Sequence, residues 1–192
     1  YPPLSKGKDF GNYTPRVRVA VGGTPVYATM TYLTATGNYM CCTSPFAEIS
    51  VGEWIHLAWT YSAATVTLRL FVNGIDRWPS GLTPATLPIT NLEDLLFGRA
   101  AFNSATDFYF DGLLDEVRIW NIVRTPAEIL ANYDQLIDPS TSGLVGYWNF
   151  DEPQSDQSVV DASVSANHGT LGADSSVATD DPVRVLSGAP IQ

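Results

Sequence analysis

A β-strand that leads directly into a capped helix is the feature that most constrains the fold of this chain. Residues 114–120 predict the strand, and Thr125 is the expected N-cap of the helix that follows. A proline stands directly after Thr125, and Glu128 stands three residues after it, so the capping box is complete. We expect a short helix over 126–133. Two apolar side chains should anchor it to the core: Ile129 and Leu130.

The rest of the sequence is typical of an all-β protein. Short alternating runs are separated by Gly, Pro, Asn, Asp and Ser, and long helical periodicity is missing. Further strands are expected at 16–21, 27–33, 54–61, 65–72, 95–98 and 107–111, with another opening at 144. The strand over 65–72 should carry four residues toward the core: Val66, Leu68, Leu70 and Val72.

Three motifs are distinctive in this chain. They lie at 52–56 with 70–74 (GEWIH and LFVNG), at 110–120 (FDGLLDEVRIW), and at 147–152 with 161–171 (YWNFDE and DASVSANHGTL). Together they resemble the signature of the laminin-G-like jelly rolls, which share the fold of concanavalin A. The resemblance covers about residues 5–175 and implies an antiparallel two-sheet jelly-roll sandwich.

We expect a single domain over residues 1–192, a length that suits one all-β domain. The early strands that the family usually carries are not recognisable in the sequence. The chain is therefore expected to be a fragment of a longer protein, a domain completed by strands from a partner, or a divergent member. A sandwich without its first strands would expose edges that pair readily with another chain.

The charge balance narrows the possible partners. Twenty acidic and ten basic side chains give a formal net charge of −10, which disfavours nucleic acid and anionic membrane surfaces. No apolar run approaches the ~20 residues of a membrane-spanning helix, so membrane insertion is not expected. Surplus carboxylates favour hard cations such as calcium, although a high net charge also serves solubility alone.

A calcium site is the main candidate for a functional centre. In related jelly rolls, calcium commonly joins a loop like that at 161–167 to the signature strand. The resemblance assigns this role to Asp161, Asn167 and Asp115, and less firmly to Asp151 and Glu152. Such an ion would hold loops together. The alternative is that these Asp and Asn side chains form turns with their own backbone.

Aromatic and modifiable residues give further candidates. Trp78, in a Pro-rich loop expected over 77–96, and Tyr39 could each stack on a sugar, and Trp78 could equally anchor a protein partner or pack internally. Asn12 begins an Asn-Tyr-Thr glycosylation sequence. Cys41 and Cys42 are adjacent, which disfavours a bond between them; we expect two small residues at a strand end or loop, although pairing with another chain stays open.

Two functions compete. The first is a non-catalytic, calcium-stabilised, extracellular or cell-surface module that binds glycans or surface and matrix proteins. The second is a structural subunit of a fibre or surface array, assembled by strand complementation between copies. A glycoside hydrolase is the third reading. It needs two carboxylates about 5 Å apart, whereas Asp115 and Glu116 are neighbours and face opposite sides of a strand, so no enzyme is expected.

Overall fold

The computed structural model describes two compact units, Tyr1–Leu113 and Leu114–Gln192. It describes residues 4–6, 16–20, 27–33, 39–45, 52–77, 94–103, 106–172, 176–179, 181–186 and 188–191. Before residue 46, and at 100–103 and 106–108, it describes the backbone alone. In these ranges no helix has the length and hydrophobicity to span a membrane. The division into two compact units does not test whether residues 1–192 form one domain, so the single domain stays a prediction.

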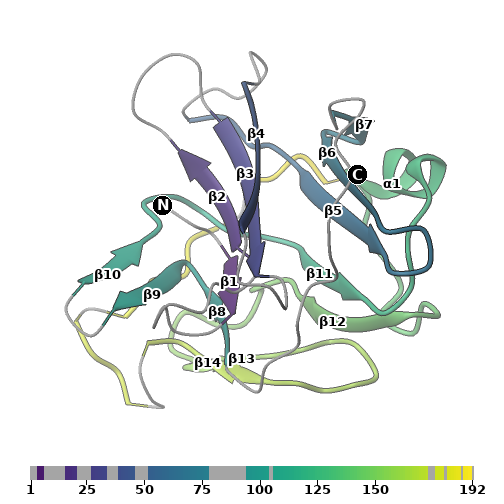
Figure 1. The fold of residues 1–192 in the computed structure, drawn as a ribbon. Coiled ribbons are helices and arrows are strands. Elements are labelled where there is room, and N and C mark those ends of the chain that lie inside the picture. The colour runs from purple at the N-terminus through teal and green to yellow at the C-terminus, as the bar shows by residue number, and fades with distance from the viewer. Residues whose placement is uncertain are drawn as a thin grey trace. The chain divides into compact units, whose positions relative to one another are not determined.

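The first unit contains a five-stranded antiparallel sheet (Figure 1). In sheet order its strands are β4 (Tyr39–Pro45), β3 (Tyr27–Leu33), β2 (Arg16–Ala20), β1 (Leu4–Lys6) and β8 (Leu95–Phe97). The expected strands over 16–21 and 27–33 are confirmed, whereas β1 and β4 were not predicted. Cys41 and Cys42 lie within β4, opposite Thr31 and Met30 of β3, and not at a strand end.

Among the side chains that the structure describes in the first unit, the buried hydrophobic ones lie in a three-stranded sheet. Its strands are β5 (Leu57–Ser62), β6 (Thr67–Val72) and β7 (Ile75–Asp76), in that order. Leu68, Leu70 and Val72 are each 1% exposed, as predicted, and Phe71 on the opposite face is fully buried as well. The strand is therefore covered on both sides, which simple alternation did not predict.

Val66 was wrongly predicted as a core residue of this strand. The turn after β5 extends to Val66, whose φ of 48° is left-handed, and β6 begins only at Thr67. The second turn of this sheet follows the expected Asn-Gly pattern. Asn73 and Gly74 both have positive φ, at 48° and 76°, which suits the tight turn between β6 and β7.

In its described residues, the second unit combines two antiparallel strand pairs with a short helix. Its elements are β11 (Val117–Trp120), α1 (Pro126–Asn132), β12 (Leu144–Trp148), β13 (Ser158–Val159) and β14 (Gly169–Thr170). Strand β11 pairs with β12, and β13 pairs with β14, both antiparallel. The predicted strand in 114–120 is confirmed in its second half. The 158–170 hairpin was not predicted.

The capping box of α1 is confirmed in full. The Thr125 hydroxyl accepts a bond from the Glu128 backbone N–H (3.2 Å), and the Glu128 carboxylate accepts one from the Thr125 N–H (2.7 Å). Ile129 is buried, as predicted. Leu130 is 54% exposed, so its predicted role as a core anchor is wrong. A helix of two turns buries only a narrow stripe, and Ile129 occupies it.

Replacing Thr125 with alanine should lower the free energy of unfolding by about 1 kcal/mol, because the first-turn N–H groups of α1 lose their side-chain acceptor. Thr125→Ser, which keeps the hydroxyl, should retain most of that stability. Denaturant unfolding of both variants measures the difference. Equal stability of the alanine and serine variants would show that the cap contributes nothing.

Candidate functional site

Asp161 is the centre of a buried polar loop in the second unit. Its side chain is 2% exposed. The Oδ1 atom accepts backbone N–H bonds from Tyr147 and Ser163, both at 2.8 Å, and Oδ2 accepts one from Asn167, also at 2.8 Å. Both carboxylate oxygens are therefore used by backbone donors, in the manner of an Asx turn extended to a neighbouring strand.

The ionised form of Asp161 is favoured by these bonds. Burial acts to raise the pKa of Asp161, but the hydrogen bonds from Tyr147, Asn167 and Ser163 outweigh it, and the pKa is lowered from its ordinary value. Hydrogen bonds donated to a carboxylate stabilise its charge. The backbone N–H groups of the folded chain therefore stabilise the negative charge of Asp161.

Acid should weaken the fold through this carboxylate. A group whose pKa is lower in the folded than in the unfolded chain stabilises the fold above its unfolded pKa, about 4 for Asp, and this contribution is lost as the pH falls through the folded pKa. We therefore expect stability to decline below about pH 4. The decline should be shallower in Asp161→Asn, which has no proton to bind. Unfolding free energies measured from pH 7 to pH 2 compare the two, and parallel curves would contradict the assignment.

Asn167 fastens the same loop to strand β12. Its side-chain Nδ2 donates to the Val145 backbone carbonyl (3.2 Å). Its backbone carbonyl accepts a hydrogen bond from the Trp148 indole N–H (3.3 Å). The His168 Nδ1 accepts from the Asp161 backbone N–H (3.1 Å). The 147–152 and 161–171 motifs are parts of one family signature. The hydrogen bonds of Asn167 and Asp161 connect these two motifs in the folded chain.

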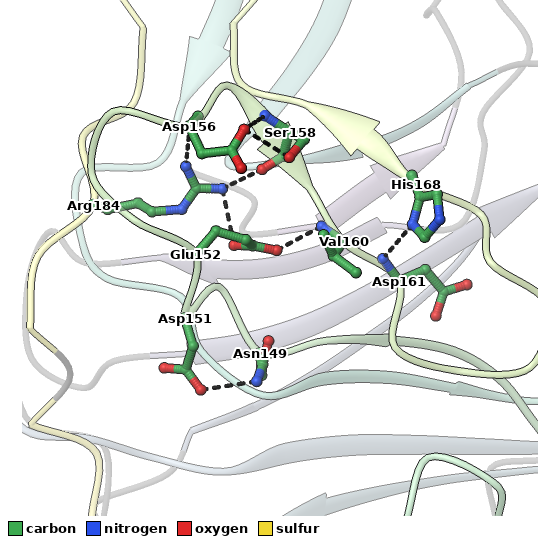
Figure 2. A network of polar contacts seen from close by, with 9 residues as sticks. All are labelled: Asn149, Asp151, Glu152, Asp156, Ser158, Val160, Asp161, His168 and Arg184. Atoms are coloured by element: carbon green, nitrogen blue, oxygen red, sulfur yellow. Dashed lines mark hydrogen bonds and ion pairs between the residues drawn. The ribbon is translucent and has the colours of Figure 1, made fainter.

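A second polar network joins Glu152 to the C-terminal segment (Figure 2). Glu152 Oε2 forms an ion pair with Arg184 Nη2 at 2.9 Å, and both side chains are at least nine-tenths buried. Glu152 Oε1 accepts from the Val160 N–H (2.6 Å). The Arg184 guanidinium also donates to the carbonyls of Asp156 and Ser158. Sequence reasoning missed Arg184 because its partners lie about thirty residues away.

A third network is centred on Glu116, the residue directly before β11. Its carboxylate pairs with Arg118 (2.5 Å) and accepts a hydrogen bond from the Tyr147 hydroxyl (2.9 Å to Oε2). Burial first, and then this hydrogen bond, raise the pKa of Tyr147 to about 12, so the phenol stays protonated. Arg118 also donates to the carbonyls of Asn132 and Gln135. The Glu-x-Arg pattern therefore connects β11, β12 and the end of α1.

The five predicted calcium ligands lie in different hydrogen-bonded settings. Asp115 accepts the Glu116 N–H (2.9 Å), and Asp151 accepts from the Asn149 amide (2.8 Å). Among the described residues, no group of three or more His, Cys, Asp or Glu side chains could hold a metal ion. As arranged, Asp161 and Glu152 fit protein donors better than a calcium ion, and calcium binding stays a prediction.

Thermal unfolding in calcium and in chelator tests that prediction. Calcium binding predicts a higher melting temperature in calcium than in chelator. The alternative, in which the Asp161 oxygens serve only the backbone N–H groups that they already accept, predicts the same melting temperature in both. A calcium-dependent rise that Asp161→Asn abolishes would instead support the ion, since a ligand bound only by the folded state stabilises it.

The predicted sugar-contact residues are only partly covered by the structure. Trp78 and the glycosylation candidate Asn12 lie outside the described residues. Tyr39 begins β4, and of this residue the backbone alone is described. These three assignments stay predictions.

An exposed tyrosine that the sequence did not single out lies in the first unit. Tyr109 ends β10 (Thr106–Tyr109), which pairs with β9 (Arg99–Asn103), and its side chain is 62% exposed. Arg99 lies directly opposite in register, with its guanidinium carbon 6.0 Å from the centre of the Tyr109 ring. The exposed side chain of Tyr109 therefore has the Arg99 guanidinium over its ring.

Comparison with known proteins places the chain in a family. The model of the concanavalin A-like lectin/glucanases superfamily, a laminin-G-type model, matches residues 8–130. The chain therefore belongs to this superfamily, and the predicted jelly-roll class, mostly β with one short helix, is confirmed.

One solved structure with the same fold is that of a candidate carbohydrate-binding protein from Bacteroides ovatus. It shares 23% sequence identity with the chain at a TM-score of 0.67. The alignment covers 100% of this chain and 52% of that one, so this chain spans about half the length of its structural relative. No curated protein is significantly similar to the chain.

Proposed function

We propose that the chain is a non-catalytic glycan-binding module. The superfamily contains both lectins and glucanases, so the choice between them depends on the acidic residues. The observation that carries the proposal is that the Glu116 carboxylate is largely buried and already bound by other side chains. This carboxylate, directly before β11, is bound to Arg118 and to the Tyr147 hydroxyl, and its side chain is only 12% exposed.

Hydrolysis of a glycosidic bond needs one carboxylic acid and one carboxylate facing the sugar across a cleft. Glu116 is directed at internal partners, and the adjacent Asp115 accepts the Glu116 N–H. Asp161 is directed at three backbone N–H groups. These residues serve the fold, which supports binding over catalysis. The structural relative, described as a candidate carbohydrate-binding protein, agrees with this choice.

A glycan array probed with the labelled chain tests the proposal. We expect binding to at least one glycan that is competed by the same glycan in solution. Incubation with that glycan should release no new reducing ends. Release of reducing ends would overturn the non-catalytic assignment, and absence of binding across the array would overturn glycan recognition.

Assembly into a fibre or array, adhesion, and location outside the cell stay predictions. The C-terminal segment offers one relevant observation: Val183 and Leu186 are 82% and 96% exposed, on either side of the anchored Arg184. Contiguous apolar patches mark contact surfaces, whereas single exposed apolar residues are common, so these two residues leave assembly open. Light scattering distinguishes the cases, because a monomer has a mass of 20.8 kDa and an assembling subunit forms larger particles.

A further inference from the structure

We propose that strand β4 is a contact edge for a second copy of this chain, and that the Cys42 residues of the two copies join in a disulfide. This contact is independent of glycan binding and belongs to the five-stranded sheet of the first unit. Its product is a covalent dimer that forms under oxidising conditions.

Strand β4 lies at one end of the strand order of that sheet (Figure 1). Among the strands that the structure describes, its one neighbour is β3. The two strands pair continuously over seven residues, from Tyr27 opposite Pro45 to Leu33 opposite Tyr39. In an antiparallel ladder, every second residue directs its N–H and C=O groups away from the neighbouring strand. The outer side of β4 therefore presents backbone groups with which another extended strand can pair.

The sequence of β4 is unlike that of a protected edge strand. Edge strands usually avoid pairing with other chains through charged side chains, proline, bulges or short length. Strand β4 reads Tyr-Met-Cys-Cys-Thr-Ser-Pro, with no charged residue and with proline only at its last position. The strand at the other end of the sheet order, β8, is only three residues long. Of these two edges, β4 is therefore the one suited to accept a second strand.

The position of the cysteines selects a second copy as the partner. When two identical strands pair antiparallel about a two-fold axis with all seven residues overlapping, the middle residue lies opposite its own equivalent. The middle residue of β4 is Cys42. Directly opposite residues have their Cα atoms about 4.5–5.5 Å apart, within the range of about 4.4–6.8 Å that disulfides span. In this register Cys41 lies on the other face of the sheet, opposite Thr43 of the second copy.

The disulfide is needed because strand pairing alone is weak between these chains. Stable interfaces bury about 1,200–2,000 Å² in total, whereas this contact is a single pair of seven-residue strands. Each copy also carries a formal net charge of −10, so two copies repel each other. A covalent bond holds the pair together against this repulsion. We therefore expect monomers in reductant and dimers in oxidant.

The bond forms by thiol–disulfide exchange with a small disulfide, here oxidised glutathione. The Cys42 thiolate of one copy attacks this disulfide, which gives a mixed disulfide and releases one glutathione. The Cys42 thiolate of the second copy then attacks the protein sulfur of the mixed disulfide and releases the other glutathione. The two protein thiols lose two protons and two electrons in total, and the two glutathione thiols take them up.

Non-reducing gel electrophoresis and light scattering after incubation with oxidised glutathione test the contact. The wild type should form a disulfide-linked dimer with twice the chain's mass of 20.8 kDa, and dithiothreitol should return it to monomer. Cys41→Ser should dimerise as the wild type does. Cys42→Ser should stay monomeric, because it lacks the thiol on the two-fold axis.

Two further variants separate strand pairing from random collision of thiols. Thr43→Glu places like charges of the two copies on a diagonal of one sheet face, and should slow dimerisation about tenfold or more. Ala64→Glu adds the same charge at an exposed turn position of the first unit and should dimerise as the wild type does. Equal melting temperatures of the reduced variants would show that each is folded.

Three results would overturn the proposal. The first is a wild type that stays monomeric in oxidised glutathione. The second is dimerisation of Cys42→Ser at the wild-type rate, which would place the bond at another residue. The third is an equal rate for Thr43→Glu and Ala64→Glu, which would show that thiols meet without pairing of the strands.

Discussion

Replacing Glu116 with alanine is expected to lower the free energy of unfolding by about 3–5 kcal/mol, the largest effect of any single change considered for this chain. The variant leaves the Arg118 guanidinium, whose side chain is 10% exposed, without its anionic partner. It also removes the acceptor of the Tyr147 hydroxyl. A buried charge and a buried hydroxyl that both lose their partners are costly.

The backbone conformation of Glu116 also bears on the expected loss of stability. Its φ is 53°, a left-handed backbone conformation that costs about 1–2 kcal/mol for a residue with a Cβ. Strain of this kind persists where the surrounding structure determines it. Because alanine also has a Cβ, Glu116→Ala keeps the strain and loses the contacts that offset it.

Two variants control for this prediction. Glu116→Gln keeps an acceptor for Tyr147 but not the charge, so it should lie between the wild type and Glu116→Ala. Glu53→Ala removes an exposed carboxylate in the first unit and should change stability by less than about 0.5 kcal/mol. Chemical denaturation monitored by tryptophan fluorescence gives all three values. A loss below about 1 kcal/mol in Glu116→Ala would show that the network is dispensable.

Asp161→Ala is expected to have the second largest effect, about 2–4 kcal/mol. Its three N–H partners belong to Tyr147, Ser163 and Asn167, and the first two of these residues are buried. Each buried donor left without an acceptor costs about 1–3 kcal/mol, less whatever water can replace. The Ala162 N–H donates to the Tyr147 carbonyl (2.8 Å), and the Asn167 N–H donates to Asp161 itself. Because the loop should lose part of its attachment to β12, hydrogen exchange at both amides should accelerate.

The conservative variant Asp161→Asn distinguishes a bonding role from a role in volume alone. The single side-chain oxygen in Asp161→Asn is insufficient for all three backbone N–H groups, so the asparagine can accept only some of these hydrogen bonds. Its amide nitrogen, itself a donor, would face a backbone N–H. We expect it to lose a smaller but measurable amount. Asp151→Ala removes an exposed carboxylate nearby, bonded to the Asn149 side chain, and should be close to neutral. Equal effects of the Asp151 and Asp161 variants would contradict the role given to Asp161.

Local patterns in the sequence predicted the elements whose signals are contained in a few residues. The capping box at Thr125 and Glu128 and the Asn73-Gly74 turn are of this kind, and the structure confirms them. Leu130 was wrong because its burial depends on what a neighbouring element covers, and Val66 was wrong because it lies in the turn before β6. That information is not in the local alternation of side chains.

The sequence predicted several residues of the polar networks, but not the groups that they contact. The sequence indicated that Asp161, Asn167 and Glu152 matter, and each is bonded at a junction between segments. Asp161 accepts backbone N–H groups, Asn167 bonds the Val145 carbonyl and the Trp148 indole, and Glu152 pairs with Arg184. Only the folded chain brings these partners near. Tyr109 was missed because an aromatic residue in a predicted strand is most often internal. No strand was predicted at 99–103, so the sequence did not place Arg99 opposite Tyr109.

The central claim is that this chain binds glycans without cleaving them. Affinity gel electrophoresis tests it directly, since a chain of net charge −10 migrates readily at neutral pH and is slowed only by what it binds. The wild-type chain should be retarded in gels that contain at least one neutral polysaccharide, and the length of that polysaccharide should not change. Unretarded migration in every gel, or a shortened polysaccharide, would contradict the claim.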